Sequence, residues 1–335
     1  MALDVKVKID LTKPIGKAGF GIPLILEESA TQAVTYKECR NLAEVVTAGF
    51  ATTTKVYKAA NTIFMQDNAP AKIAVCATTD VATTWLSDVA NVGRDWRQLI
   101  VVTNSSTATV ISDIMSKVET LANKMYFADL GTDSTTSLTV TGINRTVLFY
   151  CDATADYPSP VAALVGATAG LSAGSFTYKN MILKGISPQA LTDTEIDAIH
   201  GKGGITFVTK AGDNVTSEGK TAGGEYIDII DSKDYITSNL EYQTQKTLNA
   251  MKKIPYDNNG IAILESVAIN VLRDAYNNGI IATAADGTPA YTVSYAKRED
   301  TDASDRAARK YIGGNIAFQL AGAVHTVDIN CEIII

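Results

Sequence analysis

Hydrophobic and polar residues alternate at both ends of this chain. Near the N-terminus the apolar positions are Leu3, Val5, Val7, Ile9 and Leu11. Mainly charged residues separate them, and the alternation ends before Pro14. After Gly322 the alternation resumes, and its apolar positions near the C-terminus are Val327, Ile329, Cys331, Ile333 and Ile335. A period of two predicts a β-strand at each end, with an apolar face that needs a cover.

Two arrangements would cover these terminal strands. Both could pair within their own chain. Alternatively, each could add to an exposed sheet edge of a neighbouring subunit, gaining main-chain hydrogen bonds and buried side chains. We take strand exchange as the working hypothesis and keep internal pairing as the alternative.

Between the ends, the spacing of hydrophobic residues changes repeatedly from a pattern typical of strands to one typical of helices. Continuous aliphatic runs predict strands, and longer amphipathic or Ala-rich runs predict helices. Strands are expected near 72–77, 99–103, 126–129, 146–151 and 205–209, and helices near 81–91, 108–124, 161–171 and 192–200. This order favours an α/β domain with a mainly parallel sheet covered on both faces.

The expected helix near 192–200 has clear end signals. Thr192 and Glu195 have the spacing of a capping box, and Leu191 and Ile196 can form a hydrophobic staple. His200 would lie in the last turn, where a histidine complements the helix dipole, so we interpret it as structural.

From about residue 235 the pattern predicts a small α+β domain. Its expected elements are a helix capped by Thr237 or Ser238, a longer helix ending at Asn278, strands near 290–295 and 315–320, and a short helix near 303–310. The predicted organisation is therefore a strand arm and hinge (1–20), an α/β outer domain (21–235), an α+β inner domain (236–322) and a second strand arm (323–335).

Composition narrows the class of protein. The 335 residues are 46% hydrophobic and 19% charged, with net charge -7, so there is no basic excess of the kind that grips nucleic acid. The first residues do not follow the pattern of a secretory signal, and no apolar run is long enough to span a bilayer. The four cysteines are scattered, which favours reduced core thiols and synthesis in a reducing cytoplasm.

Candidate chemical motifs are weak. Gly219-Lys220-Thr221 has the wrong glycine spacing for a phosphate loop and precedes a strand-like segment, so we expect a glycine-rich loop. Gly16, Gly19 and Gly21 with Pro23 predict a hinge or a surface loop. Asp228 and Asp231 could share a cleft, or simply face solvent. We expect His325 on the aliphatic face of the last strand, without a nearby partner for metal or nucleophilic chemistry. Taken together, these motifs predict no catalytic, cofactor or metal site.

The short C-terminal helix has an uneven charge distribution. Acidic residues are in its first turn, and Arg306, Arg309 and Lys310 come toward its end. This pattern matches the helix dipole, and it could also present a basic stripe to an acidic partner.

Several of these segments together resemble a known family. They are Leu272 to Ile281, Tyr291 to Val293, Arg306 to Arg309, Leu320 to Ile329, and the preceding Gly224 to Ile236. In this order they resemble the C-terminal domain of contractile tail sheath proteins from phages and phage-tail-like bacteriocins, over roughly the last third of the chain.

The resemblance implies a non-enzymatic subunit of the tail sheath of a virion or phage-tail-like particle, assembled in the bacterial host cytoplasm. It implies hexameric rings stacked helically around a tail tube, which contract and drive the tube through a target envelope. The implied partners are further copies of the chain, the tube protein, and baseplate and tail-terminator proteins, with no direct contact to nucleic acid. It also implies a tube-facing helix, for which Arg306, Arg309 and Lys310 are our candidates. The alternatives are a cytosolic α/β enzyme with internally paired ends and another self-assembling shell or tube protein.

Overall fold

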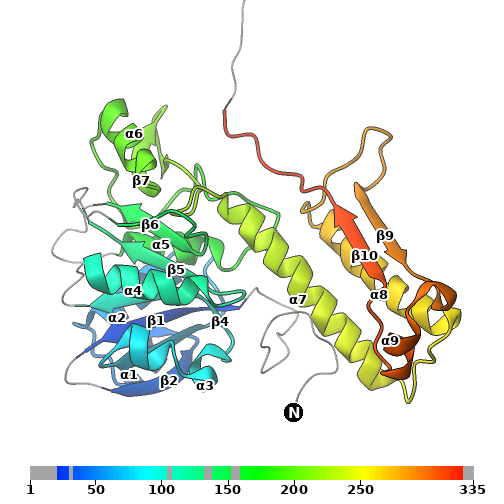
Figure 1. Ribbon diagram of the computed structural model, residues 1–335. Coiled ribbons are helices and arrows are strands. Elements are labelled where there is room, and N and C mark those ends of the chain that lie inside the picture. Colours follow the sequence, from blue (N-terminus) through cyan, green and yellow to red (C-terminus); the bar gives the residue numbers. More distant parts are fainter. Residues whose placement is uncertain (1–20, 30–32, 104–107, 132–137, 152–158, 327–335) are drawn as a thin grey trace, which may run out of the picture.

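The fold consists of two units joined by one long helix, α7 (Ile227–Ala250), as Figure 1 shows. The computed structural model describes residues 21–29, 33–103, 108–131, 138–151 and 159–326. The N-terminal unit contains a large sheet with helices on both faces, and the C-terminal unit contains a helix and a small sheet.

The large sheet has eight strands in the order β2-β3-β1-β4-β5-β6-β7-β8. They are β1 (Ile22–Glu28), β2 (Val34–Cys39), β3 (Ile73–Thr78), β4 (Trp96–Thr103), β5 (Met125–Asp129), β6 (Thr146–Tyr150), β7 (Gly204–Lys210) and β8 (Asp213–Thr216). All pairs from β3 to β7 are parallel, and β2 and β8 close the two edges in antiparallel pairing. This topology confirms the predicted α/β class with a mainly parallel sheet.

Two apolar layers cover the sheet because alternate strand residues point to opposite faces. In β1, Ile25 belongs to one layer, whereas Leu24 and Leu26 belong to the other. The helices of this unit are α1 (Leu42–Thr47), α2 (Lys55–Phe64), α3 (Val89–Val92), α4 (Ala108–Glu119), α5 (Pro160–Thr168) and α6 (Asp193–Gly201). Helices α2 and α5 pack in the first layer, and α4 packs in the second. The capping box of Thr192 and Glu195 is present at the start of α6, as predicted.

Two expectations for the N-terminal unit were wrong. Pro23 lies inside the central strand β1 and not in a hinge, and the pairing of β1 with β4 shifts register between Ile22 and Leu24 to accommodate it. The helix expected near 81–91 is divided into a π-helical turn, η1 (Val81–Trp85), and α3, because Asp88 caps a new start.

The C-terminal unit consists of α8 (Asn258–Asn277), β9 (Tyr291–Tyr295), a 3-10 turn η2 (Arg298–Asp300), α9 (Ala303–Ala307) and β10 (Gly314–Phe318). Its small core joins α7, α8 and the sheet through residues that include Ile236, Leu272, Ala275 and Ile281. The two strands pair antiparallel.

Helix α7 begins at Ile227, eleven residues before the start expected with Thr237 as its cap. Thr237 and Ser238 lie within the helix and cap nothing, and the segment after Gly224 that we interpreted as strand-like is its first turn. The proposed domain boundary at 235 therefore falls within α7. The domain limits themselves stay a prediction.

Candidate functional site: the α7 junction and the open C-terminal sheet

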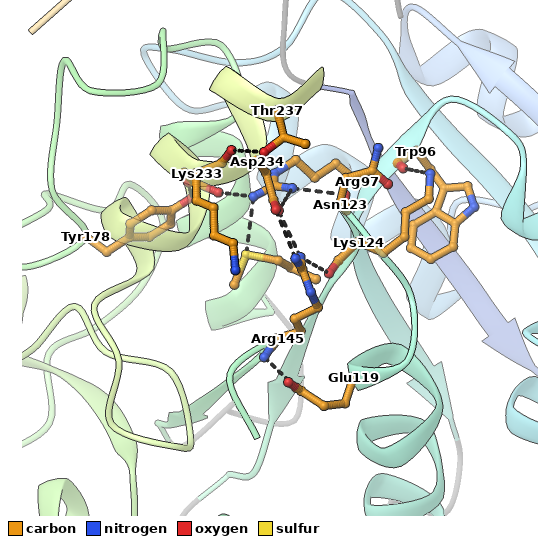
Figure 2. A network of polar contacts seen from close by, with 12 residues as sticks. Trp96, Arg97, Glu119, Asn123, Lys124, Arg145, Tyr178, Lys233, Asp234 and Thr237 are labelled. Atoms are coloured by element: carbon orange, nitrogen blue, oxygen red, sulfur yellow. Dashed lines mark hydrogen bonds and ion pairs between the residues drawn. The ribbon is translucent and has the colours of Figure 1, made fainter. Parts of the chain in front are cut away.

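A buried ion network fixes the first half of α7 to the large sheet (Figure 2). Asp231 and Asp234 are three residues apart and therefore lie on one side of the helix. Arg97 of β4, only 3% exposed, donates to the Asp234 carboxylate at 2.9 Å and also to Asp231. The same guanidinium donates to the Asn123 carbonyl oxygen at 2.9 Å. One arginine thus ties two turns of α7 to the end of a central strand.

A second arginine and a tyrosine complete this network. Arg145 donates to the two carboxylate oxygens of Asp234 at 2.8 and 2.9 Å, and the Tyr178 hydroxyl donates to Asp231 at 2.8 Å. Burial alone would raise the pKa of Asp234, but hydrogen bonds from Arg145 and the charge of Arg97 hold it below its ordinary value. Two guanidinium and two carboxylate groups balance in charge, so each buried ion has a partner.

The lysine beside this network is buried as well. Lys124 donates to the carbonyl oxygen of Arg94 at 2.9 Å and to that of Trp96, and its ammonium lies 4.5 Å from the Trp96 ring centroid. Burial lowers its pKa to about 7. Our sequence interpretation missed the whole network. The available signal was an arginine or lysine next to each of three buried aliphatic strands: Arg97, Lys124 and Arg145.

The chain after β10 returns to the large unit. His325 Nε2 lies 2.9 Å from Thr177 Oγ1, and its ring meets the Tyr226 ring edge-on at 4.9 Å. Glu218 Oε1 is 3.6 Å from His325 Nδ1. Within the chain, residues 321–326 form no strand, so His325 is not in an internally paired strand; a strand arm over 323–335 that pairs with a neighbour stays a prediction. His325 instead fixes the position at which the last described segment passes the N-terminal unit.

The small sheet of β9 and β10 has two outer edges. Within the described residues, neither strand is paired along its other side. Gln319 donates its N–H to the Ala290 oxygen at 2.9 Å, and because N–H directions alternate along a strand, the N–H of Phe318 points to the outer edge of β10. An unpaired edge of this kind is a template for a further strand.

The predicted terminal arms lie outside the described residues. This holds for Leu3, Val5, Val7, Ile9 and Leu11, and equally for Val327, Ile329, Cys331, Ile333 and Ile335. Strand exchange by these arms stays a prediction.

The three basic residues near α9 differ in their surroundings. Helix α9 ends at Ala307, so Arg309 and Lys310 follow it instead of lying on it. Arg306 is half-buried and donates to the carbonyl oxygens of Arg298, at 3.1 Å, and Thr301. Arg309 and Lys310 are exposed, and Arg309 has a left-handed backbone with φ 57°. The expectation of one helical stripe was therefore wrong, while a role toward the tube stays a prediction.

The remaining motifs have structural partners. Lys220 forms a β-bridge with Tyr226, with its ammonium 4.9 Å from that ring centroid, so Gly219-Lys220-Thr221 is a loop, as expected. Asp228 lines a cavity of about 270 Å³ between α7, residues 174–177 and residues 320–323, whereas Asp231 faces Arg97. The two carboxylates do not share one cleft.

Other side chains considered for chemistry are also part of the framework. His200 is in the last turn of α6, where its Nε2 lies 2.9 Å from Ser217 Oγ. Cys39 and Cys76 are buried free thiols, as predicted, Cys151 is buried as well, and Cys331 is outside the described residues. The part of the chain that the structure describes has no cluster of three or more potential metal ligands. No described helix has both the length and the apolar character needed to cross a membrane.

Comparison with known proteins supports one family. Residues 227–333 match the family model of the E217 tail sheath protein gp31-like, C-terminal domain. No curated protein sequence matches the chain significantly.

Solved structures extend the likeness to the N-terminal unit. A chain of the PVC sheath complex, an extracellular contractile injection system in its contracted state, has a TM-score of 0.70 at 14% identity, covering 99% of this chain and 97% of that chain. A chain of the contracted helical sheath of the anti-feeding prophage has a TM-score of 0.69 at 13% identity, with 98% of each chain covered. The sheath tail protein of Listeria innocua has a TM-score of 0.58 at 11% identity, covering 83% of this chain and 89% of that chain.

The chain is thus an α/β protein with the fold of contractile sheath subunits. Its C-terminal part, residues 227–333, matches the model of a tail sheath C-terminal domain, in agreement with the resemblance found in the sequence.

Proposed function

We propose that this protein is the structural subunit of a contractile tail sheath. In this proposal the subunits form hexameric rings that stack helically around a tail tube, and contraction drives the tube through a target envelope. The observation that carries the proposal is the match of residues 227–333 to a tail sheath domain that contains a small sheet with an unpaired outer edge. The likeness of the whole chain to sheath structures in the contracted state supports it further.

The proposed assembly uses the terminal arms as links. The alternating part of the N-terminal arm, before Pro14, and the arm at 323–335 would add as strands to the outer edges of β9 and β10 of neighbouring subunits, because their alternating pattern supplies an apolar face and the edges supply free main-chain groups. Contacts of this kind join unlike surfaces, and repeated contacts of that type generate a helical array.

The partners and location follow from the same proposal. The subunit would contact further copies of itself, the tube through the exposed Arg309 and Lys310, and the baseplate and terminator at the two ends of the sheath. It would act as a structural component of a virion or phage-tail-like particle assembled in the bacterial cytoplasm, not as an enzyme.

Removal of one arm tests the proposal. A chain ending at Val324 retains β10 and nearly all described residues, and we expect a folded monomer that no longer forms tubes. Negative-stain microscopy and analytical ultracentrifugation would compare it with the full chain under the same conditions. Tubes of normal length from the truncated chain, or no tubes from the full chain, would contradict the proposal.

A further inference from the structure

The chain that follows β10 forms a strap, residues 321–326, between the two units (Figure 1). At its start the Ala321 N–H donates to the Ile280 carbonyl oxygen at 2.9 Å. After this bond the strap is exposed, and its first residues and α7 line a cavity of about 270 Å³. The strap then meets the N-terminal unit through the side chain of His325. It therefore spans an open space between two attachments.

The second attachment is a single buried side chain. The side chain of His325 is 10% exposed, whereas the preceding residue, Val324, is 82% exposed. The imidazole Nε2 lies 2.9 Å from Thr177 Oγ1, and the ring meets the Tyr226 ring edge-on. A hydroxyl can donate or accept, so this hydrogen bond forms whether the imidazole is neutral or charged. Its strength does not by itself depend on the charge of the ring.

The other ring nitrogen of His325 faces negative charge. Its Nδ1 is buried and has no hydrogen bond within the described part of the chain. Glu218 Oε1 lies 3.6 Å from this nitrogen. Asp228 of α7 is the second carboxylate near the ring: burial raises the pKa of Asp228, and the charge of His325 partly opposes that effect. Both carboxylates favour the charged imidazole over the neutral one.

Further charged groups surround these carboxylates. Three of them are the lysines Lys179, Lys210 and Lys220. Lysine ammoniums are charged at both pH 6 and pH 8, so their effect on Glu218 is the same at either pH. His200 is the other titratable group beside Glu218; burial lowers the pKa of His200, and the Glu218 charge opposes this. A test of His325 must therefore separate it from His200.

We propose that His325 is a latch whose hold on the strap depends on its charge. As an imidazolium it pairs with Glu218 and Asp228 and fixes the strap to the N-terminal unit. The latch is tight at acidic pH and loosens as pH rises through the range in which histidine loses its proton. Gly322, which has a left-handed backbone with φ 64° and nothing within 4 Å of an added Cβ, is the pivot. The inference concerns a single chain and does not depend on the sheath function.

Elastase cleavage of the strap tests the latch. This protease accepts small apolar residues, which the strap offers at Ala323 and Val324, and it cuts a segment that opens locally. The full chain is kept dilute enough to sediment as single subunits, and mass spectrometry measures the rate of cleavage. The single variants leave the strap sequence unchanged. Rates are compared at one pH at a time, so the pH dependence of the protease itself cancels.

Two single variants separate the charged contact from the neutral one. Glu218→Gln keeps an acceptor for the Gly219 N–H and removes the charge, so cleavage should be about threefold faster or more at pH 6 and unchanged at pH 8. Thr177→Val removes the hydrogen bond made in both charge states and should speed cleavage at both pH values. Glu299→Gln, on the exposed η2 turn, is the matched charge control and should change neither rate.

Double variants assign the effect to one histidine. The acceleration by Glu218→Gln at pH 6 should persist in a chain that also carries His200→Gln and disappear in one that carries His325→Gln. The opposite pattern, or an equal effect of Glu218→Gln at pH 6 and pH 8, would overturn the control by charge. Unchanged cleavage in Thr177→Val would show that this side chain does not hold the strap, and it would overturn the latch altogether.

Discussion

At the residue scale, Asp234 has the central position in the α7 junction. It accepts hydrogen bonds from Arg97 in β4 and from Arg145, which directly precedes β6, and it is 5% exposed. Removing one member of a buried ion cluster leaves the others charged and desolvated. The residue therefore holds α7 to the sheet while also making the burial of Arg97 tolerable.

We expect Asp234→Asn to lower the free energy of unfolding by about 3 to 5 kcal/mol, since Arg97 and Arg145 would lose their shared counter-ion. The measurement is urea unfolding followed by the fluorescence of Trp96, which lies beside the network. Asp113→Asn on the exposed side of α4 makes the same chemical change and should stay within about 0.5 kcal/mol of the unaltered protein. A loss of less than about 1 kcal/mol in Asp234→Asn would show that the network does not hold the helix.

The effect of Asp234→Asn should also depend on pH. The folded-state pKa of Asp234 is below that of the unfolded chain, so its ionised form adds stability above the ordinary aspartate pKa of about 4. This contribution is lost as pH falls through the lower, folded-state pKa. The difference between the two proteins should therefore be constant from pH 7 to 5 and shrink at more acidic pH. A difference that persists unchanged at pH 2 would mean that shape, not charge, carries the effect.

At the element scale, α2 and α5 approach each other through a glycine. A Cβ added at Gly166 of α5 would lie 2.7 Å from both the Cα and the carbonyl oxygen of Ile63 in α2. Gly166→Ala should destabilise the fold by about 1 to 3 kcal/mol, because two helix backbones must separate. Gly201→Ala, at the end of α6 where a Cβ would meet nothing within 4 Å, is the matched control and should be neutral or slightly stabilising. Thermal unfolding of both variants checks this, and equal melting temperatures would contradict it.

The same scale shows what the sequence could predict. The aliphatic runs of β3 to β7 identify buried parallel strands, and the Thr192–Glu195 spacing identifies the start of α6. The start of α7 could not be predicted from the sequence. The segment that begins it, Ile227 to Ile230, has the pattern of a strand, and Tyr226 supplies no side-chain cap. Strand β1 was not predicted because it contains Pro23. The pairing of β1 with β4 accommodates this proline at a shift in register. The pairing of Arg97 with Asp234 joins positions 137 residues apart, so it depends on the sheet order and is not readable from local spacing.

At the scale of the whole molecule, α7 connects the ion network on the large sheet to the small sheet of β9 and β10, which has unpaired outer edges among the described residues. Its first half is held by the ion network, and its second half supports the unit that contains β9 and β10. In the proposed sheath, a shift of one large unit would then be passed along α7 to the small sheet. The strands added to that sheet would keep neighbouring subunits linked while the larger units change their packing.

The outer edge of β10 is where this idea can be tested. Phe318 is 36% exposed, and its N–H points away from β9, so a proline there removes the outward donor without breaking the β9–β10 pairing. We expect Phe318→Pro to remain folded by circular dichroism and to lose assembly by at least tenfold in a sedimentation assay. Phe318→Ala keeps the N–H and removes the ring, so it should assemble far better than the proline variant. Because the two variants differ in the main-chain donor, normal assembly by Phe318→Pro would mean that no strand adds at this edge.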